Sequence, residues 1–256
     1  MLLWTVHVLV VIPARIGSSR LPHKPLCLLH GQPLIRIVAR RAVDYGLGRV
    51  VVASDDARVL RAVSSLAVDT VLTSPTHSSG TARVAEVVER PEYTGCGIVV
   101  NLQCDQPFVP REVVRGAIGC VEAGFPVGSA AVSLAADDQE NPNRVKVVVA
   151  GGGRAVSFTR SPLYATGCES GNRVLHHVGV YAYTRAALLS WVASPQCEAE
   201  RLERLEQLRP LRQGVPIGVA CFDIPPPLAI DTRDDVRLAS LGFVGSELLS
   251  RSRMSA

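Results

Sequence analysis

Residues 10–25 read VVIPARIGSSRLPHKP, an apolar run that passes directly into a loop of glycine, serine and basic residues. Together with the apolar residues before it, from position 2 onward, this run predicts the first buried strand of the fold. Gly17 and the small serines after it allow backbone N–H groups to face an anion, as concave loops and helix N-termini do. The stretch therefore predicts a strand followed by a phosphate-binding loop.

Lysine is rare in this chain, because Lys24 and Lys146 are the only lysines among 27 basic residues. Lys24 closes the loop, beside Arg15 and Arg20. The arginines offer planar forks for bidentate phosphate contacts, whereas a lysine offers a compact point charge that can follow a moving oxygen. This division of roles favours phosphoryl transfer. Because the loop matches neither the Walker pattern nor G-x-G-x-x-G, a solvated basic loop remains the alternative interpretation.

The composition indicates one large α/β domain. The chain has 256 residues, 47% of them hydrophobic, and a net charge of +4 without a long basic run. It can bury a full core, and we expect anionic small molecules rather than nucleic acid as partners. Its seven cysteines are scattered singly, with no C-x-x-C pair and no cluster at zinc spacing, which predicts a cytoplasmic protein without a structural metal. No apolar run has the length that a bilayer requires, so no membrane partner is expected.

The first half of the chain alternates between strand and helix patterns. The expected order after the loop is a helix opened by Pro33, a strand at 50–53, a helix capped by Asp55 and Asp56, a strand near 71–72, a helix after Ser79–Thr81, and a strand at 98–102. Repeated units of this kind predict a predominantly parallel sheet with helices on both faces. Ligands of such sheets bind at the carboxyl ends of the strands, where the loops with polar motifs follow.

After about residue 125 the pattern changes to a mixed sheet with hairpins. The expected elements are a strand at 127–134, a hairpin of 145–149 with 155–159, a strand at 178–183, an amphipathic helix at 198–212, a strand at 217–224, and a last helix with Thr232 as N-cap and Asp235 in a capping box. We therefore expect the second half to extend the sheet of the first.

Two aspartates stand where carboxylates could reach a ligand at the sheet edge. Asp105 follows a buried strand, and Asp231 follows a late strand and a proline-rich turn. Mg²⁺ takes oxygen ligands and usually keeps one or two protein carboxylates together with substrate phosphates. An ordinary turn residue is the alternative for Asp105, and a helix N-cap is the simpler interpretation of Asp231 taken alone. Only a second carboxylate nearby would make Asp231 a metal ligand.

A polar group interrupts the apolar pattern of the strand at 178–183. Strand alternation places His177 and Tyr181 on the same face. A buried histidine that bonds backbone carbonyls is one interpretation. The other is that His177 and Tyr181 form a polar pocket for a hydroxylated acid with Arg160, Glu206 and Gln207. The residues alone leave both open.

A series of motifs spans nearly the whole chain in one order: IPAR at 12–15, LPHKPL at 21–26, SGTAR at 79–83, VNLQCDQP at 100–107, NP at 141–142 with VKV at 145–147, HVGVY at 177–181, LEQLR at 205–209 and DT at 231–232. In these motifs and their order the chain closely resembles 3-deoxy-manno-octulosonate cytidylyltransferases, also called CMP-Kdo synthetases. The resemblance implies a Rossmann-like nucleotide-diphospho-sugar transferase fold. It also implies an Mg²⁺-dependent cytoplasmic homodimer that joins CTP to the acid sugar Kdo, giving CMP-Kdo and pyrophosphate for lipopolysaccharide biosynthesis.

The resemblance also implies a division of the chain and a set of site residues. Residues 1–256 would form a single nucleotidyltransferase domain with a CTP-binding half (about 1–125), a sugar-acid-binding and dimerisation portion (about 126–216), and a return to the main sheet with a C-terminal helix (about 217–256). The nucleotide-binding residues would be Pro13, Ala14, Arg15, Ser18, Arg20, Lys24, Ser79, Gly80, Arg83 and Gln103. The sugar-acid-binding residues would be Gln103, Arg160, His177, Tyr181, Glu206 and Gln207. Asp105 and Asp231 would bind the metal and, with Lys24 and Arg15, form the catalytic set.

The chain departs from the family pattern at several positions. Cys104 replaces a glycine, which costs backbone freedom only if that position needs a positive φ. Gln106 replaces a glutamate, and Ala82 replaces an acidic residue, which we expect to leave Arg83 without an ion-pair partner. Residues 161–164 lack the usual Ile-Pro-aromatic order. Two other functions therefore stay open: a cytidylyltransferase for another acid sugar, such as 8-amino-Kdo or sialic acid, and a catalytically weakened nucleotide-binding protein.

Overall fold

The computed structural model describes residues 7–18, 20–163 and 171–241. The first residues of the expected strand, 2–6, lie outside this range. So do Ser19 of the loop, Tyr164 and Cys168.

One mixed sheet organises the described chain, in the strand order β11-β7-β10-β6-β1-β4-β5. These strands are β1 (Val8–Ala14), β4 (Arg49–Ser54), β5 (Asp69–Leu72), β6 (Ile98–Asn101), β7 (Val127–Val132), β10 (Arg173–Thr184) and β11 (Ile217–Phe222). β6, β1, β4 and β5 run parallel to one another, as do β7 and β11, whereas β10 runs antiparallel to both of its neighbours. The parallel strands are rich in valine and isoleucine because both of their faces are buried. The predicted, predominantly parallel sheet is confirmed.

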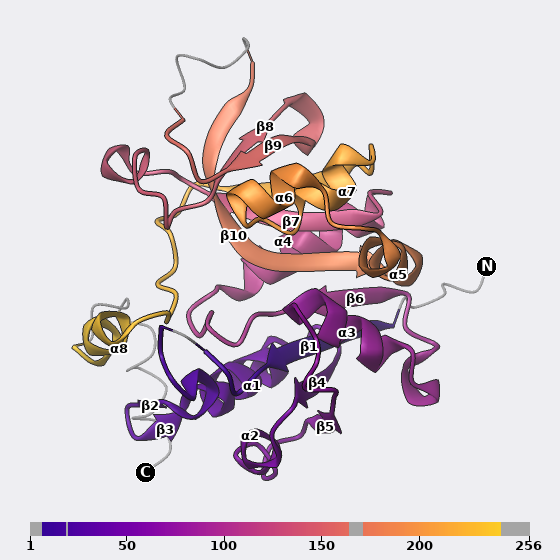
Figure 1. Ribbon diagram of the computed structural model, residues 1–256, viewed down its shortest axis with the longest axis vertical. Helices are drawn as coiled ribbons and strands as arrows, with labels where there is room; N and C mark the ends of the chain where they lie inside the picture. The colour runs from indigo at the N-terminus through magenta and orange to yellow at the C-terminus, as the bar shows by residue number, and fades with distance from the viewer. Residues whose placement is uncertain (1–6, 19, 164–170, 242–256) are drawn as a thin grey trace.

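A hairpin and two short strands complete the strand set of the described residues. β8 (Lys146–Val149) and β9 (Ala155–Thr159) pair antiparallel, and β8 also pairs with the first part of β10. The hairpin predicted at 145–149 and 155–159 is therefore confirmed. β2 (Leu28–Leu29) and β3 (Gln32–Pro33) form a small separate ladder after the first loop. In Figure 1 the early strands lie in the lower part of the molecule, and β8 and β9 lie in the upper part.

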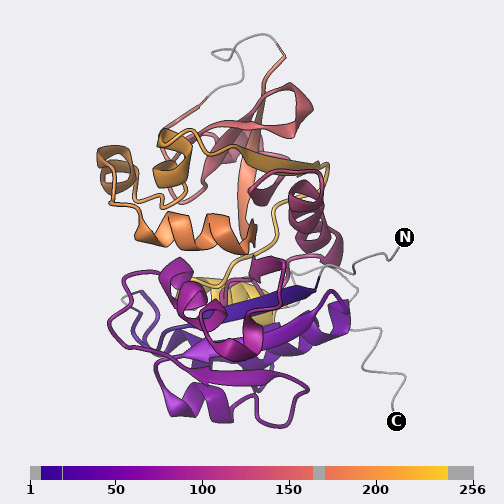
Figure 2. The same ribbon diagram turned by 90° about the vertical axis from the view of Figure 1, so that its right-hand side faces the viewer.

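Helices cover both faces of the sheet, as predicted. The helices are α1 (Leu34–Tyr45), α2 (Ala57–Arg61), α3 (Gly80–Val88), α4 (Arg111–Glu122), α5 (Arg185–Ala193), α6 (Glu198–Glu203), α7 (Leu208–Arg212) and α8 (Arg233–Ser240). The apolar side chains of α3 and α5 pack in one core cluster, and those of α1, α2 and α4 pack in a second cluster on the other face. The rotated view in Figure 2 also shows helices on both sides of the sheet.

Several predicted helix starts are present. Asp56 caps α2 through Arg58 N, Ser79 caps α3 through Ala82 N, and Thr232 and Asp235 form the capping box of α8. α8 then returns to the first half, where it lies beside β2 and β3 in Figure 1 and shares a small apolar cluster with that region. The last helix therefore packs beside the first loop of the chain.

The helix predicted over 198–212 is wrong as a single element. Arg204 adopts a left-handed conformation with φ 54°, which ends α6 and separates it from α7. Leu205 and Leu208 are buried, but Leu202 is 76% exposed. The break is stabilised on both sides, because Glu203 accepts hydrogen bonds from Arg160 and Thr159 while Glu206 accepts bonds from α3.

Two helices, α4 and α5, have no counterpart among the expected elements. α4 contains Gly116 and Gly119, which weaken a helix pattern in sequence. Gly116 lies against β11, where a Cβ atom would come within 2.7 Å of the ring of Phe222. Close helix–sheet packing, which the local sequence does not reveal, therefore explains this glycine. Among the helices of the described residues, none is long and apolar enough to cross a membrane.

Candidate functional site

A cavity of about 300 Å³ opens at the carboxyl ends of β1 and β6. Its walls come from the loop after β1, the 3₁₀ turn at Lys24–Leu26, the start of α3, the loop after β6, and the segment before α8. The lining residues are Pro13, Ala14, Arg15, Ser18, Arg20, Lys24, Pro25, His77, Ser78, Ser79, Gly80, Arg83, Gln103, Cys104, Asp105 and Asp231. Every residue predicted to bind nucleotide and both predicted metal ligands are therefore brought to one cavity.

Lys24 joins the two predicted carboxylates. Its Nζ lies 2.8 Å from Asp105 Oδ2 and 2.7 Å from Asp231 Oδ1, although the two aspartates are far apart in sequence. Burial lowers the pKa of Lys24, but the charges and hydrogen bonds of Asp105 and Asp231 outweigh burial, so its pKa lies above the ordinary 10.5. Lys24 is therefore an ammonium at neutral pH, held at the centre of an acidic pair.

Backbone contacts explain why the two acidic segments meet. Ile230 N donates to Asp105 O at 2.8 Å, which ties the segment before α8 to the loop after β6. Thr232 is the N-cap of α8, so the carboxylate of Asp231 is not used as the cap. It instead contacts Lys24 and also Arg20, whose Nη2 lies 3.1 Å from Asp231 Oδ1. The N-cap interpretation of Asp231 is therefore wrong, because the neighbouring threonine has that role.

Arg83 has an acidic partner, contrary to expectation. Its side chain is 3% exposed, its Nη2 lies 3.6 Å from Asp55 Oδ2, and its Nη1 donates to Thr73 Oγ1. Burial lowers the pKa of Arg83, and the negative charges of Asp55 and Glu86 oppose that effect. The expectation was based only on the residue at position 82. The negative charge that compensates Arg83 is that of Asp55, which directly follows β4.

Two of the predicted sugar-acid residues lie inside the core rather than on the cavity wall. His177 and Tyr181 are 6% and 8% exposed, and their rings lie 5.4 Å apart on one face of β10. His177 Nε2 lies 2.9 Å from Ser129 Oγ, and Ser129 donates its single hydroxyl hydrogen to Val180 O. His177 Nε2 therefore carries the hydrogen of that bond. Burial lowers the pKa of His177 to about 3, so the ring is neutral at physiological pH.

The histidine is thus satisfied by a serine hydroxyl, and not by the backbone carbonyls that the simpler interpretation proposed. The alternation prediction is confirmed, since Val178 and Val180 pack in the cluster on the opposite face.

Of the other predicted sugar-acid residues, Gln103 lines the cavity, and Arg160, Glu206 and Gln207 are not among its lining residues. Gln103 donates from Nε2 to Asn101 Oδ1 at 3.1 Å. Arg160 donates to the backbone carbonyls of Glu203 and Pro142, each at 3.1 Å. Burial lowers the pKa of Arg160, Arg20 lowers it further, and Glu203 and Asp231 raise it. The charges of Arg20 and Asp231 therefore act on Arg160, although among the described residues its guanidinium bonds only backbone carbonyls.

The remaining two residues of that set follow α6. Glu206 accepts hydrogen bonds from Ser79 Oγ at 2.7 Å and Thr81 Oγ1 at 2.8 Å, and Gln207 is 4% exposed. Glu206 thus joins the second half to the start of α3, whose first residues line the cavity.

Sequence reasoning missed His77 as a residue of this site and noted Cys104 only as a departure from the family pattern. His77 lines the cavity, and its Nε2 lies 2.5 Å from Glu86 Oε2 on α3. The sequence places this histidine two positions before the Ser79 cap, a spacing that could have drawn attention to it. Cys104 also lines the cavity and is 6% exposed. It is not among the described non-glycine residues with positive φ, so its position does not require a glycine.

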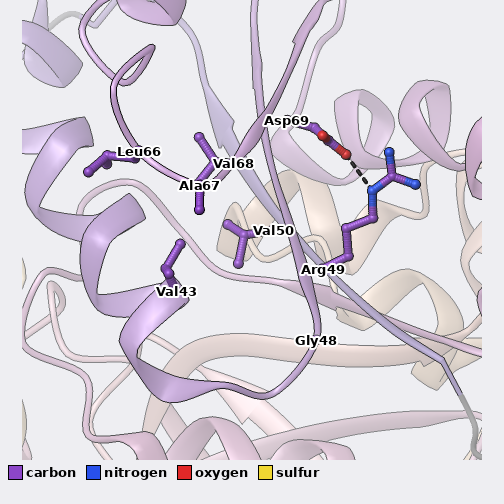
Figure 3. Close-up of a pocket in the computed structure, with 8 residues that line it drawn as sticks. All are labelled: Val43, Gly48, Arg49, Val50, Leu66, Ala67, Val68 and Asp69. Atoms are coloured by element: carbon purple, nitrogen blue, oxygen red, sulfur yellow. Dashed lines mark hydrogen bonds and ion pairs between the residues drawn. The ribbon is translucent and has the colours of Figure 1, made fainter.

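A second hollow of about 350 Å³ lies where β4 and β5 begin, and it contains none of the predicted site residues. Figure 3 shows Arg49 and Asp69 at its edge, with Arg49 Nε 2.5 Å from Asp69 Oδ2. The two charges satisfy each other. Parallel sheets bind ligands at the carboxyl ends of their strands, so the first cavity is the candidate active site.

Residues 9–217 match a protein family described as cytidylyltransferase. A 3-deoxy-manno-octulosonate cytidylyltransferase of Gemmatimonas aurantiaca is 44% identical over 236 residues, which cover 90% of this chain and 91% of that protein. The corresponding protein of Stenotrophomonas maltophilia strain K279a is 41% identical over 244 residues, covering 90% and 94% of the two chains.

Solved structures agree with these relatives. A CMP:2-keto-3-deoxy-manno-octonic acid synthetase complexed with CTP matches with a TM-score of 0.83 and 35% identity, covering 93% of this chain and 98% of that one. A cytidylyltransferase from Leptospira borgpetersenii matches with a TM-score of 0.60 at 13% identity, covering 96% and 91%, which shows a shared fold alone.

Proposed function

Because the chain belongs to the cytidylyltransferase family, and within it to the 3-deoxy-manno-octulosonate cytidylyltransferases, we propose that it transfers the cytidylyl group of CTP to Kdo. The products are CMP-Kdo and pyrophosphate, for use in lipopolysaccharide biosynthesis. One structural observation supports the proposal independently of the similarity to known proteins. Lys24, Asp105 and Asp231 meet in the cavity that every predicted nucleotide-binding residue lines.

The residues present fit a magnesium ion bound together with substrate. Asp105 and Asp231 both reach one nitrogen atom, and the described residues contain no group of three or more His, Cys, Asp or Glu side chains that could hold a metal by themselves. Two carboxylates completed by substrate phosphates are a usual environment for Mg²⁺. Asp105 and Asp231 would hold the ion, which would supply charge stabilisation for the phosphates and activation of the attacking hydroxyl.

The basic residues of the cavity would bind and orient the triphosphate. Arg15, Arg20 and Lys24 come from one loop and one turn, so their positive charges surround the same space. In the reaction, a bond forms between the anomeric oxygen of Kdo and the α-phosphorus, and the bond from that phosphorus to the pyrophosphate oxygen breaks. The proton of the attacking hydroxyl is released to solvent. Negative charge grows on the leaving pyrophosphate, and cations already in position stabilise it. No covalent enzyme intermediate is required.

The acid sugar would bind between the cavity and the second half of the chain. Arg160 is the candidate partner of the sugar carboxylate, because its guanidinium hydrogen bonds go to backbone carbonyls and no described acidic side chain lies within ion-pair distance of it. Gln103 and Glu206 border both regions. This arrangement supports CTP binding by about residues 1–125, sugar-acid binding by about 126–216, and a return of the chain to the main sheet at 217–256, within a single domain.

We also propose a cytoplasmic homodimer. The six cysteines of the described chain are free thiols, as expected in a reducing compartment. In the 126–216 portion, Val156 is 49% exposed and Leu202 is 76% exposed, and such large apolar side chains suit an interface. Sedimentation of the purified protein at a single-chain mass would contradict the dimer.

A sugar-panel assay tests the proposed reaction. Pyrophosphate release is measured with CTP, Mg²⁺ and each of Kdo, 8-amino-Kdo and sialic acid, and we expect Kdo to give the highest kcat/KM. Asp105→Asn should lower turnover with Kdo about 10²- to 10³-fold, since a charged group is removed from the reacting centre. Asp69→Asn, in the ion pair at the opposite end of the sheet, is the matched control. CTP binding without pyrophosphate release from any sugar would favour the weakened nucleotide-binding protein instead.

A further inference from the structure

Two adjacent aspartates at the end of β4 have different partners. Asp56 caps α2 and forms an ion pair with Arg58, so its bonds stay on its own helix. Asp55 contacts two other parts of the chain: its Oδ1 accepts from Ile16 N at 3.0 Å, and its Oδ2 lies 3.6 Å from Arg83 Nη2. The sequence predicted the same capping role for both residues, and the structure assigns that role to Asp56 alone.

Both partners of Asp55 belong to segments that contribute residues to the wall of the nucleotide cavity, although only Arg83 itself lines it. Ile16 lies in the loop between Arg15 and Ser18, and those two residues line the cavity. Arg83 lines it from α3. Asp55 itself is not among the lining residues, and its side chain is 12% exposed. It therefore lies behind the wall, where it connects the phosphate loop to α3.

The two oxygens of Asp55 have separate effects. One fixes the backbone of the loop through the Ile16 N–H group. The other supplies negative charge to Arg83, whose side chain is 3% exposed and would otherwise be a poorly compensated buried cation. At 3.6 Å the second contact is an ion pair without a direct hydrogen bond, so it does not use up a guanidinium donor of Arg83. The nearby positive charge of Arg15 makes this compensation more necessary.

We propose that Asp55 is a positioning residue of the nucleotide site, which holds the Ile16 loop and Arg83 in the arrangement that binds CTP without touching either substrate. The proposal rests on the proposed function, since it assumes that this cavity binds CTP. It goes beyond that function because it assigns affinity for the nucleotide to a side chain outside the cavity.

The test compares Asp55→Asn with Asp56→Asn. Both variants replace a carboxylate by an amide of the same size at neighbouring positions. Asp55→Asn keeps an oxygen for Ile16 N–H but removes the charge facing Arg83, so we expect KM for CTP to rise roughly tenfold, the effect of about one charged interaction. Asp55→Ala removes both contacts and should raise KM for CTP further. Asp56→Asn should leave KM for CTP unchanged, because asparagine is also a good N-cap.

Two additional measurements separate positioning from a general loss of structure. KM for Kdo should stay near the wild-type value in Asp55→Asn, and Asp55→Glu should recover part of the CTP affinity. The proposal is overturned if the two substrates lose affinity equally, or if Asp55→Asn and Asp56→Asn behave alike. Calorimetric titration of CTP without sugar gives the same comparison even if no acid sugar is turned over. Failure of the proposed reaction and failure of the Asp55 role are therefore distinguishable.

Discussion

The proposed nucleotide side and the proposed sugar-acid side of the site are built differently. On the nucleotide side, every residue predicted from the sequence lines one cavity. On the sugar-acid side, Gln103 lines the cavity, whereas His177 and Tyr181 are in the core and Glu206 is bonded to Ser79 and Thr81. The first side presents side chains to a ligand, and the second already satisfies most of its polar groups internally.

The difference follows from strand direction. Parallel strands end at the same edge of a sheet, so the loops that follow β1 and β6 meet. β10 runs antiparallel between β6 and β7, and alternate side chains along it enter the two core clusters. A polar residue in such a strand must find its partner within the protein. The nucleotide side is therefore preformed in loops, and the sugar-acid side is fixed by packing.

Of the substitutions considered, replacement of Lys24 on the nucleotide side should cause the largest loss of activity. Lys24→Met leaves the carboxylates of Asp105 and Asp231 without the ammonium between them and removes a cation from the proposed triphosphate site. We expect kcat/KM for pyrophosphate release to fall about 10²- to 10³-fold. Near-normal turnover would contradict the central role of this lysine.

The second lysine offers the matching test of the sugar-acid side. Lys146 is completely buried, and its Nζ donates to Asn141 O at 3.0 Å and Arg160 O at 2.9 Å. Lys146→Met removes the donor to Arg160 O and leaves Asn141 O with only the Arg144 N–H group, which should lower the free energy of unfolding by about 1–3 kcal/mol. Because Arg160 loses an anchor, KM for Kdo should rise while KM for CTP stays constant. A rise in KM for CTP alone would contradict the separation of the two sides.

The buried histidines should make the sugar-acid side sensitive to acid. Burial lowers the pKa of His177 to about 3 and that of His176 to about 4, from an ordinary 6.5. Below pH 6.5 the unfolded chain therefore binds more protons than the folded one, and the free energy of unfolding should fall as the pH drops toward 4. Urea unfolding at a series of pH values measures this dependence. His177→Phe should make the free energy of unfolding depend less steeply on pH. An unchanged slope would contradict the conclusion that burial of His177 lowers its pKa.

The smallest effect on activity is expected at Cys104. This residue stands where the family pattern has glycine, but its backbone does not require a positive φ. Cys104→Gly should therefore leave pyrophosphate release unchanged and destabilise the fold by about 1–3 kcal/mol, because the entropic cost of glycine adds to the loss of a side chain buried in the core. A gain in turnover would show instead that the cysteine limits the nucleotide side.

The meeting of the predicted nucleotide-binding residues at one cavity could be anticipated because the strand and loop patterns that position them are local. Apolar runs located β1, β4 and β6, and the polar loops after β1 and β6 then had to converge. The convergence of Asp105 and Asp231 was predictable only through the family resemblance, since nothing near Asp231 in sequence indicates that Ile230 bonds to the loop of Asp105.

The missed features depend on contacts between distant segments. The left-handed Arg204 breaks an amphipathic pattern that otherwise continues through Leu205 and Leu208. Asp55 pairs with Arg83 across two strand–helix units, so the identity of residue 82 gave the wrong expectation. In both cases the side chains could be read from the sequence, but their contacts depend on the tertiary structure.

The long strand β10 pairs with strands from both the nucleotide side and the sugar-acid side of the molecule. Its last residues, 181–184, pair with β6, and its first residues, 173–176, pair with β8. One strand backbone therefore pairs with strands of both halves of the chain. We expect amide protons at both ends of this strand to exchange with solvent at similar rates, in a single cooperative opening. Thermal stress that loosens the acid-sugar half should consequently be transmitted to the strands that support the phosphate loop.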